Sequence, residues 1–470
     1  MNPFSYKYIA DPIYKSIGLS QIEAHVIDTP VFQRLRGIKH LGLVSLVYPG
    51  ADFSRFDHSL GVCHVTGQIL ASLNISVDVI QTYRLAALLH DIGHYPFSHP
   101  MEEAIKNFYS GTYLVRVSDQ NENDLEGKEN TERYIDHEKV GKEILHHDKL
   151  LRDTLVEAGH DPNYISSIFV GERRSEFANL IKSDLDADRI DYLLRTAHHT
   201  GLPYGSVDLA YLLNQMKLDG DKKIVVHERA LRAAEHLLLS RYFVYQQTIY
   251  HKTVVAFEHI LKNVLQEMLG RKRVQFSRND VTRAIQNGEW HGWNDAYIMQ
   301  KIVEVAAEGD IDSTTKKEID SICLRKPPSL VAEREELKSS SDTQYKKDFQ
   351  NTKNQLKEKI PAWAKKFGID QKLWALWDLS GLTLTSIGSV VSTSAMAEVG
   401  LEDKYEQTVR VGEANSNASR SIIEHRRSLM SVMSNYSVYC LRVYVLISER
   451  KNEIRKEIQD CIKSEIIFFQ

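Results

Sequence analysis

The residues best suited to chemistry lie in one short stretch, Leu85-Ala-Ala-Leu-Leu-His90-Asp91-Ile-Gly-His94-Tyr-Pro-Phe-Ser-His99. It begins as an apolar helix and ends in a His-Asp doublet followed by two more histidines. A buried doublet of this kind is unfavourable without a partner, because an unpaired charge in an apolar setting costs several kcal/mol. A divalent metal satisfies neutral imidazole and carboxylate together. We therefore interpret His90 and Asp91 as metal ligands. A helix continuing through His94 would place all three residues on one face.

Two more positions complete a metal-binding set in the order His58, His90-Asp91 and Asp188. Arg55 and His58 are three apart at a helix start, so one supplies positive charge where the other supplies a ligand. Two imidazoles and two carboxylates suit Mn, Fe or Zn and leave positions for water and a phosphate oxygen. Such a metal would lower the pKa of bound water and polarise phosphorus.

The stretch around Asp188 carries further polar residues at helical spacing. Arg189 and Tyr192 could hold a phosphate or a sugar. Asp191 and Arg195 are four apart, which predicts an ordinary helix salt bridge that needs no function.

The elements that must position these residues are mostly helices. Pro30 starts the first strong helix, whose polar face carries Gln33, Arg34, Arg36, Lys39 and His40; this face is either solvated or a phosphate contact. Apolar helices follow over 62–73, 83–91, 230–269 and 290–324. Residues 1–30 suggest a strand or hairpin, and 379–397, although uncharged, are rich in Ser and Thr and predict buried strand or loop rather than a membrane span. Near the end of the chain we predict helices over 416–447 and 448–465.

Composition excludes several classes of protein. The chain has 470 residues, 59 basic against 63 acidic residues and a net charge of −4, which argues against a long nucleic acid as partner. Four scattered cysteines predict reduced thiols, and no secretory signal is visible at the start. We expect a cytoplasmic protein without membrane contact.

Several motifs together resemble those of the HD-domain superfamily, and more closely the deoxynucleoside triphosphate (dNTP) triphosphohydrolases, including the vertebrate enzymes that carry a sterile-alpha-motif domain. The resemblance covers roughly residues 5–335. It rests on Ile27-Asp-Thr-Pro-Val-Phe-Gln-Arg-Leu-Arg36, Pro49-Gly-Ala, Arg55-Phe-Asp-His-Ser-Leu-Gly61, His90-Asp-Ile-Gly-His-Tyr-Pro-Phe-Ser-His99, His137-Glu138 and Asp188-Arg-Ile-Asp-Tyr192.

This resemblance implies a mainly α fold: an HD helical core with small β hairpins and a mixed, mostly helical C-terminal lobe. We expect a catalytic core over 1–270 with an exposed insertion loop at 109–133, a helical extension over 271–337, a polar linker over 338–359 and a lobe of unassigned role over 360–470. By resemblance the protein is also a homo-oligomer that limits dNTPs, for instance in antiviral defence.

In that family, water activated at the metal attacks the α-phosphate and releases the deoxynucleoside with intact tripolyphosphate. The resemblance assigns the metal to His58, His90, Asp91 and Asp188, with Mg on the substrate phosphates. It makes His99 the acid for the leaving oxygen and has His94 and His137 hold the α-phosphate. It assigns phosphate contacts to Arg55, Arg189 and Arg241 and places Tyr192 under the sugar.

The sequence departs from the family at two sugar-binding positions. His40 replaces a glutamine and Thr196 replaces an aspartate, which puts the sugar specificity in doubt. Asp28, Gln33 and Arg36 match positions that bind an activating guanine nucleotide in relatives, although the basic residues expected near Tyr211 and Lys223 are largely missing. These three residues form either an allosteric site or only a helix start.

Three functions follow. The first is metal-dependent hydrolysis of dNTPs to deoxynucleoside and tripolyphosphate. The second is an HD phosphohydrolase or phosphodiesterase that acts on another nucleotide, such as a signalling or modified one. The third is a nucleotide-sensing regulatory subunit, suggested by the unmatched C-terminal lobe.

Overall fold

A computed structural model describes residues 4–110, 134–171, 177, 180–181, 183, 185–220, 223–383, 408–412, 419–448 and 450–469. Its fold is mainly α, which confirms the predicted class. Most of the predicted insertion loop, residues 111–133, lies outside the described residues. No described helix is long and apolar enough to cross a membrane.

The N-terminal hairpin and four helices build the centre of the core. The hairpin pairs Lys7 with Leu19 and is followed by the short helices that carry the Pro30 motif. Helix α3 packs against α4 and α9, and α9 packs against α11. The bounds are β1 (Lys7–Asp11), β2 (Lys15–Leu19), α1 (Gln21–Ile27), α2 (Pro30–Gln33), η1 (Arg34–Gly37), η2 (Gly42–Leu46), α3 (Arg55–Ser72), α4 (Val77–Leu89), α9 (Ala187–Thr200) and α11 (Leu231–Gln247).

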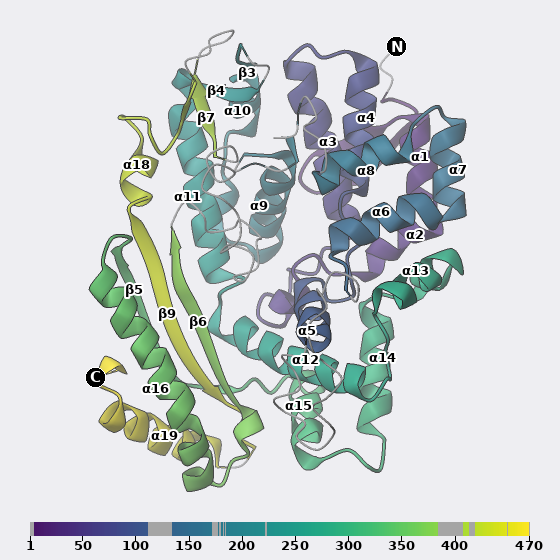
Figure 1. The fold of residues 1–470 in the computed structure, drawn as a ribbon. Coiled ribbons are helices and arrows are strands. Elements are labelled where there is room, and N and C mark those ends of the chain that lie inside the picture. The colour runs from purple at the N-terminus through teal and green to yellow at the C-terminus, as the bar shows by residue number, and fades with distance from the viewer. Residues whose placement is uncertain are drawn as a thin grey trace.

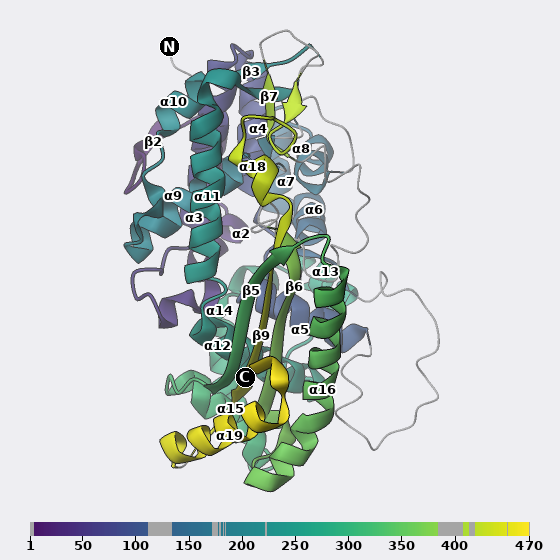
Figure 2. The same ribbon diagram turned by 90° about the vertical axis from the view of Figure 1, so that its left-hand side faces the viewer.

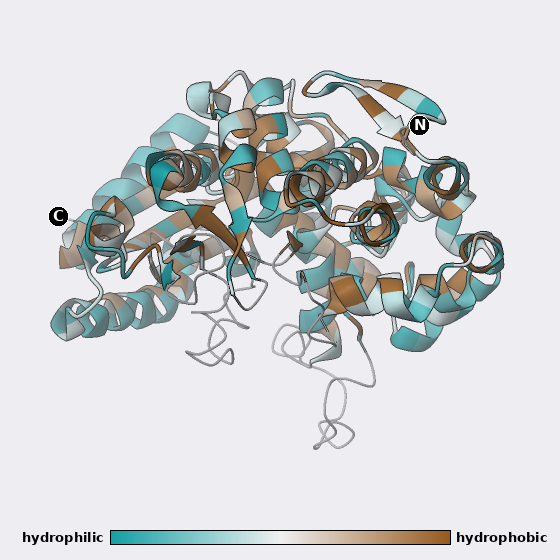
Figure 3. Cartoon of the chain, turned by 90° about the horizontal axis from the view of Figure 1, so that it is seen from above, coloured by the Kyte–Doolittle hydropathy of each residue, from teal (hydrophilic) through white to brown (hydrophobic). Residues whose placement is uncertain are grey.

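More helices surround this centre and share its hydrophobic core (Figure 1). Helix α12 packs against α5 and α15, and α6 packs against α8. The bounds are α5 (His99–Tyr109), α6 (His137–His147), α7 (Lys149–Glu157), α8 (Pro162–Val170), η6 (Pro203–Gly205), α10 (Leu209–Asn214), η7 (Glu228–Ala230), α12 (Lys252–Gly270), α13 (Arg278–Gln286), η8 (Glu289–Gly292), α14 (Asp295–Ala306) and α15 (Ser313–Cys323). Viewed from above, hydrophobic residues gather between the helices and hydrophilic ones lie on the outside (Figure 3).

The C-terminal region forms an antiparallel sheet in the order β5-β9-β6. Helices α16 and α19 cover its outer face, as Figure 2 shows, and bury a second hydrophobic core there. Val255 and Ala256 of α12 pack with Ala375 and Tyr444 of the sheet in a separate small cluster. The bounds are β5 (Ser329–Ser339), α16 (Thr343–Phe367), η9 (Gln371–Leu373), β6 (Trp374–Thr383), β9 (Tyr436–Val445), α19 (Lys451–Glu465) and η11 (Ile467–Phe469).

Two sequence predictions fail in this region. The helix expected over 416–447 is wrong, because that range holds β8 (Arg420–Ser421), α18 (Leu429–Met433) and strand β9. The expected polar linker over 338–359 consists of the end of β5 and much of α16. The domain boundaries themselves stay predictions. The uncharged 379–397 stretch begins in β6 as expected, and its part after residue 383 lies outside the described residues.

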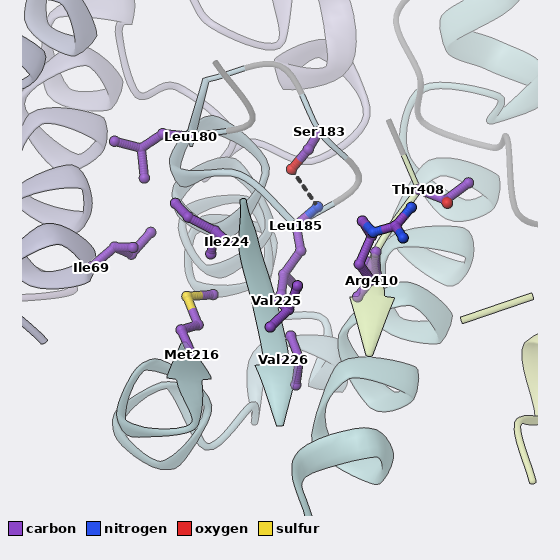
Figure 4. Close-up of a pocket in the computed structure, with 11 residues that line it drawn as sticks. Ile69, Leu180, Ser183, Leu185, Met216, Ile224, Val225, Val226, Thr408 and Arg410 are labelled. Carbon is purple, nitrogen blue, oxygen red and sulfur yellow. Dashed lines mark hydrogen bonds between the residues drawn. The ribbon is translucent and has the colours of Figure 1, made fainter. Parts of the chain in front are cut away.

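A second small sheet has the strand order β3-β4-β7-β8 and joins residues 410–421 to the core. Strand β4 pairs in parallel with β7, where Val226 lies opposite Val411. The remaining bounds are β3 (Met216–Leu218), β4 (Ile224–His227) and β7 (Arg410–Gly412). A small pocket lies against this sheet and is lined by Ile69, Leu185, Met216 and Arg410 among others (Figure 4), but by none of the predicted site residues.

Candidate metal and phosphate site

The start of α3 carries the first two site residues. Ser54 caps the helix, with its hydroxyl and the Asp57 carboxylate each accepting from the other's backbone N–H. This fixes the first turn, in which Arg55 and His58 point into the core. The Arg55 Nε donates to Ser98 Oγ at 2.8 Å, and its Nη1 forms an ion pair with Asp91. Arg55 therefore orients a candidate ligand; its contact with a phosphate stays a prediction.

The His90-Asp91 doublet lies where α4 ends. The helix stops at Leu89, so a continuous helix from His90 to His94 does not form, and the doublet occupies a turn. The His90 Nδ1 donates to the Ala87 carbonyl at 2.7 Å, which leaves Nε2 as the ring's free acceptor. In this way the helix end itself fixes the tautomer that a metal needs.

Asp188, in the first turn of α9, brings the fourth ligand to the same point. Its Oδ1 lies 2.9 Å from His58 Nε2 and 4.0 Å from His90 Nε2. Asp91 Oδ2 lies 3.9 Å from His58 Nε2, and Asp91 Oδ1 lies 3.3 Å from His90 Nε2. The four predicted ligands are therefore gathered into one group.

These distances fit an ion. Metal bonds of about 2.1 Å put neighbouring octahedral ligands about 3.0 Å apart and opposite ones about 4.2 Å apart. Nε2 of His58 and Nε2 of His90 are both buried, and neither makes a hydrogen bond of good geometry. Leaving His90 Nε2 without a partner is costly, and a divalent cation would satisfy it while replacing the ion pair of His58 Nε2 with Asp188.

Behind the ligands lies a buried network that the sequence reading missed. Asp191 accepts from His58 Nδ1 at 2.8 Å and from both Nε and Nη2 of Arg195. Arg195 Nη1 donates in turn to Asp11 Oδ2 at 2.9 Å. The interpretation of Asp191 and Arg195 as a pair without function is therefore too narrow, because Asp191 fixes the tautomer of a candidate ligand. The available signal was the spacing of Asp191, one turn after Asp188.

The charges agree with this arrangement. Burial alone would raise the pKa of Asp91, but Arg55 and His90 hold it well below its usual range. Burial would likewise lower the pKa of His58, but Asp188 and Asp191 raise it to about 9. A metal arriving at His58 Nε2 must therefore displace a proton, so we expect its binding to weaken as pH falls.

Three further histidines form a second cluster beside the ligands. The rings of His94 and His137 stack with centroids 3.9 Å apart, and the His99 ring lies 5.5 Å from His94. His94 Nε2 approaches Asp91 Oδ1 to 3.1 Å, which joins the cluster to the doublet. The three predicted catalytic histidines are thus brought together, although His99 is half exposed.

Glu102, on α5, organises this cluster and was also missed. Its carboxylate accepts from the His137 backbone N–H, from His137 Nδ1 at 3.0 Å and from the Tyr134 hydroxyl at 2.6 Å. Burial would lower the pKa of His137, but Glu102 raises it to about 9. Its position three residues after His99 was the only sequence signal.

Three of the predicted phosphate and sugar residues lie on α9 and α11, which pack against each other. Arg189 follows Asp188 on α9, and Arg241 is buried on α11. Burial raises the pKa of Tyr192 well above its usual range, and the nearby positive charges of Arg241 and Arg189 oppose that rise. Tyr192 also makes an edge contact with Tyr245.

His40 lies beside His58 and Thr196 lies on α9, and both carry a buried polar atom without a hydrogen-bond partner: His40 Nδ1 and Thr196 Oγ1. The His40 ring stacks on Phe53 and its centroid lies 4.2 Å from that of His58.

The proposed allosteric residues lie at the end of α1, in α2 and in η1. Gln33 Nε2 donates to Ile27 O, and Arg36 Nε donates to Gln33 Oε1 at 2.8 Å. Asp28 caps the end of α1. These local contacts are those of a helix start, and a nucleotide site there stays a prediction.

The polar face after Pro30 is not uniformly solvated. Arg34 is buried over the Trp290 ring and donates to the carbonyls of Trp293, Ile92 and His94. For Arg34, both readings made from the sequence, a solvated face or a phosphate contact, are wrong. Its role is to hold the turn after the doublet in place.

The comparisons with known proteins agree with this site. Residues 55–196 match the HD domain and residues 207–284 match the HD associated region. An uncharacterized protein of Methanocaldococcus jannaschii is 33% identical over 273 residues, 57% of this chain and 51% of that protein. The deoxynucleoside triphosphate triphosphohydrolase SAMHD1 of Danio rerio is 29% identical over 226 residues, 42% of this chain and 34% of that protein. The chain spans about half the length of the Methanocaldococcus jannaschii protein and of two other uncharacterized curated relatives that it matches.

Solved structures share the fold over nearly the whole chain. A hypothetical protein from Aquifex aeolicus superposes with a TM-score of 0.68 at 23% identity and covers 97% of this chain and 99% of its own. A phosphohydrolase from Bacteroides thetaiotaomicron superposes with a TM-score of 0.65 at 20% identity. The match covers 93% of this chain and 99% of that one. The chain thus carries an HD domain with its associated region, distantly similar to the SAMHD1 enzymes.

Proposed function

We propose that the protein is a metal-dependent hydrolase that converts dNTPs to deoxynucleosides and tripolyphosphate. The observation that carries this proposal is the convergence of His58, His90, Asp91 and Asp188 next to a stacked pair of histidines. The similarity to the SAMHD1 enzymes supports the choice of substrate class.

A divalent ion held there, Mn, Fe or Zn, would lower the pKa of a bound water and polarise the phosphate. The chain itself supplies the rest. His94 would hold the α-phosphate through Nδ1, which has no hydrogen-bond partner, and His137 through Nε2, because its Nδ1 is engaged with Glu102. The pairing of His137 with Glu102 keeps that imidazole protonated near neutral pH, which suits an anionic phosphate.

His99 would protonate the leaving 5′-oxygen. It is the most exposed of the three histidines, and a group that must meet an entering substrate needs such access. Arg189 and Arg241 would offset the charge of the outer phosphates, which Mg would share, and Tyr192 would lie against the sugar. Nucleotide activation through Asp28, Gln33 and Arg36, and assembly of identical subunits, belong to the same proposal.

A second candidate is hydrolysis of another nucleotide, such as a signalling or modified one. The observation in its favour is that His40 and Thr196 stand where the family has a glutamine and an aspartate. A neutral imidazole and a hydroxyl present different hydrogen-bond partners from an amide and a carboxylate.

The decisive experiment incubates the purified protein with Mn²⁺ and a panel of dNTPs, NTPs and modified nucleotides, each with and without candidate activators. Mass spectrometry identifies the products. We expect deoxynucleoside with tripolyphosphate. We expect Asp188→Ala to abolish this activity while the protein stays folded, as a thermal melt would show. Release of a monophosphate would favour the second candidate.

Finding no product from any nucleotide, with every activator tested, would refute both candidates and favour a nucleotide-sensing subunit. Turnover at ordinary rates, about 1 s⁻¹ or faster, would exclude that subunit role.

A further inference from the structure

His40, a predicted sugar contact, lies directly beside the candidate metal ligands His58 and Asp91. A ring nitrogen of His40 and ligand atoms of His58 and Asp91 all lie within 4.8 Å of one another. At this site the potential ligands fall into two groups: His40, His58 and Asp91 in one, and His58, His90 and Asp188 in the other.

His58 belongs to both groups. Its Nδ1 is engaged with Asp191 at 2.8 Å, which leaves only Nε2 for a metal. A single nitrogen lone pair binds one ion, so the two groups cannot be two independent sites. They describe the surroundings of one ion with five candidate ligands.

The position of His40 is set by its neighbours. Its backbone N–H donates to the Phe53 carbonyl at 3.0 Å, and its ring stacks on the Phe53 ring with an interplanar angle of 23°. These contacts hold the imidazole beside His58 at a centroid distance of 4.2 Å. Because the ring is already in place, little conformational entropy is lost when it binds an ion.

The buried Nδ1 of His40 has no hydrogen-bond partner. A neutral imidazole has one donor and one acceptor nitrogen, so a buried unpaired Nδ1 leaves one of these groups unsatisfied. A cation that binds Nδ1 fixes the tautomer with the proton on Nε2 and removes this cost.

We propose that His40 is a fifth protein ligand of the ion held by His58, His90, Asp91 and Asp188. The ligand atoms of His40, His58 and Asp91 lie within 4.8 Å of one another, and opposite ligands of an octahedral ion lie about 4.2 Å apart, so these three need to approach by at most about 0.6 Å to share an ion. Five protein ligands would leave one position of an octahedral ion for the attacking water, and the phosphate would then be held by His94 and His137 without a bond to the ion. The set of three imidazoles and two carboxylates favours Mn, Fe or Zn over Mg.

This inference rests on the metal site of the proposed function, and its test must separate the two. Metal-free protein is titrated with Co²⁺ in competition with a chromophoric chelator, and the visible absorption of the bound cobalt is recorded. The wild-type chain is compared with His40→Gln, which restores the family's residue, and with His40→Ala. Thr196→Val is the matched control, because it alters the other unusual position without removing a candidate ligand.

We expect both His40 variants to bind Co²⁺ at least tenfold more weakly than wild type and to show an altered cobalt spectrum, since a nitrogen ligand is lost. Thr196→Val should keep the wild-type affinity and spectrum. Circular dichroism melts establish that each variant is folded.

The inference is overturned if the His40 variants bind cobalt as wild type does, within twofold and with the same spectrum. A change in nucleotide selectivity alone would then make His40 a substrate contact. If wild-type protein itself binds no ion stoichiometrically, the proposed function fails and not only this inference.

Discussion

The metal-binding side of the candidate site is more firmly supported by its neighbours than the side that carries His99. On the metal side, the His58 side chain is 1% exposed and is backed by the buried chain of Asp191, Arg195 and Asp11. On the other side, His99 is 49% exposed, and its Nδ1 lies 3.9 Å from Glu102. Ligands profit from being fixed before an ion arrives, whereas an acid that serves a leaving group must meet a substrate that comes and goes.

The strongest test of the rigid side is Gly61→Ala. A Cβ at Gly61 would lie 1.8 Å from Asp191 Oδ1 and 2.6 Å from Arg195 Nη2, so the network would have to move. We expect a loss of about 3 kcal/mol in the free energy of unfolding, at the upper end for overpacking, together with loss of stoichiometric metal binding. Denaturant titration and metal analysis measure the two effects.

Gly309→Ala is the matched control, because a Cβ there meets nothing within 4 Å, and its effect should stay below about 0.5 kcal/mol. If Gly61→Ala were as mild as this control, the close approach of α3 and α9 would not be the constraint that holds His58.

Asp191→Asn removes the charge behind His58 without removing a ligand. We expect metal affinity to fall about 10- to 100-fold, as when other partners that orient a ligating histidine are lost. Chelator competition measures it. Asp280→Asn, a cap of α13 away from the site, should leave the affinity unchanged. Equal affinity in both variants would show that the metal side needs no support from Asp191.

Sequence reasoning located the residues that bear chemistry but not those that support them. His58, His90, Asp91 and Asp188 form a recognisable ordered set, and each stands at or near a helix end where its local spacing is informative. Asp191, Glu102 and Asp11 could not be assigned in this way. Their roles depend on which helices pack together, and no local periodicity encodes that.

The C-terminal lobe shows the same limit for the fold. Strand β9 is buried on both faces after its first residue, so its apolar residues run continuously instead of alternating and can be mistaken for a helix. Residues 338–359 are polar and charged and include Ser339-Ser-Ser-Asp-Thr, a composition that indicated a linker although they form the end of β5 and much of α16. Apolar residues such as Phe349 and Trp363 pack α16 against the sheet, so their role can be recognised only once the sheet is known.

Glu102→Gln tests the more open side. It removes the carboxylate that pairs with His137 but keeps an amide oxygen as acceptor. We expect a loss of about 2 kcal/mol in the free energy of unfolding near pH 6, which a full truncation of a partly buried ion pair would exceed. We also expect weaker binding of the substrate phosphate, which would appear as a higher KM.

The pH dependence of this loss follows from the two pKa shifts. The raised pKa of His137 makes its contribution complete below pH 6.5 and lost as pH rises through about 9. The lowered pKa of Glu102 makes its contribution present above pH 4.5 and lost as pH falls further. The difference between wild type and Glu102→Gln should therefore be largest between about pH 4.5 and 6.5. A difference that grew above pH 9 would contradict the pairing.

The smallest effect is expected at Asp11→Asn, the outermost member of the metal-side network. Asp11 Oδ2 faces Arg195, while its Oδ1 accepts from the backbone of Ile13 and Tyr14 in the hairpin turn. Asparagine keeps the turn acceptor and loses only the charge, so we expect a change in metal affinity below about threefold, or about 0.7 kcal/mol. Measured beside Asp191→Asn by the same chelator competition, it tests whether support for His58 decays along the chain of contacts. An effect as large as that of Asp191→Asn would mean that the whole network, including the N-terminal hairpin, acts as one unit in holding the ligand.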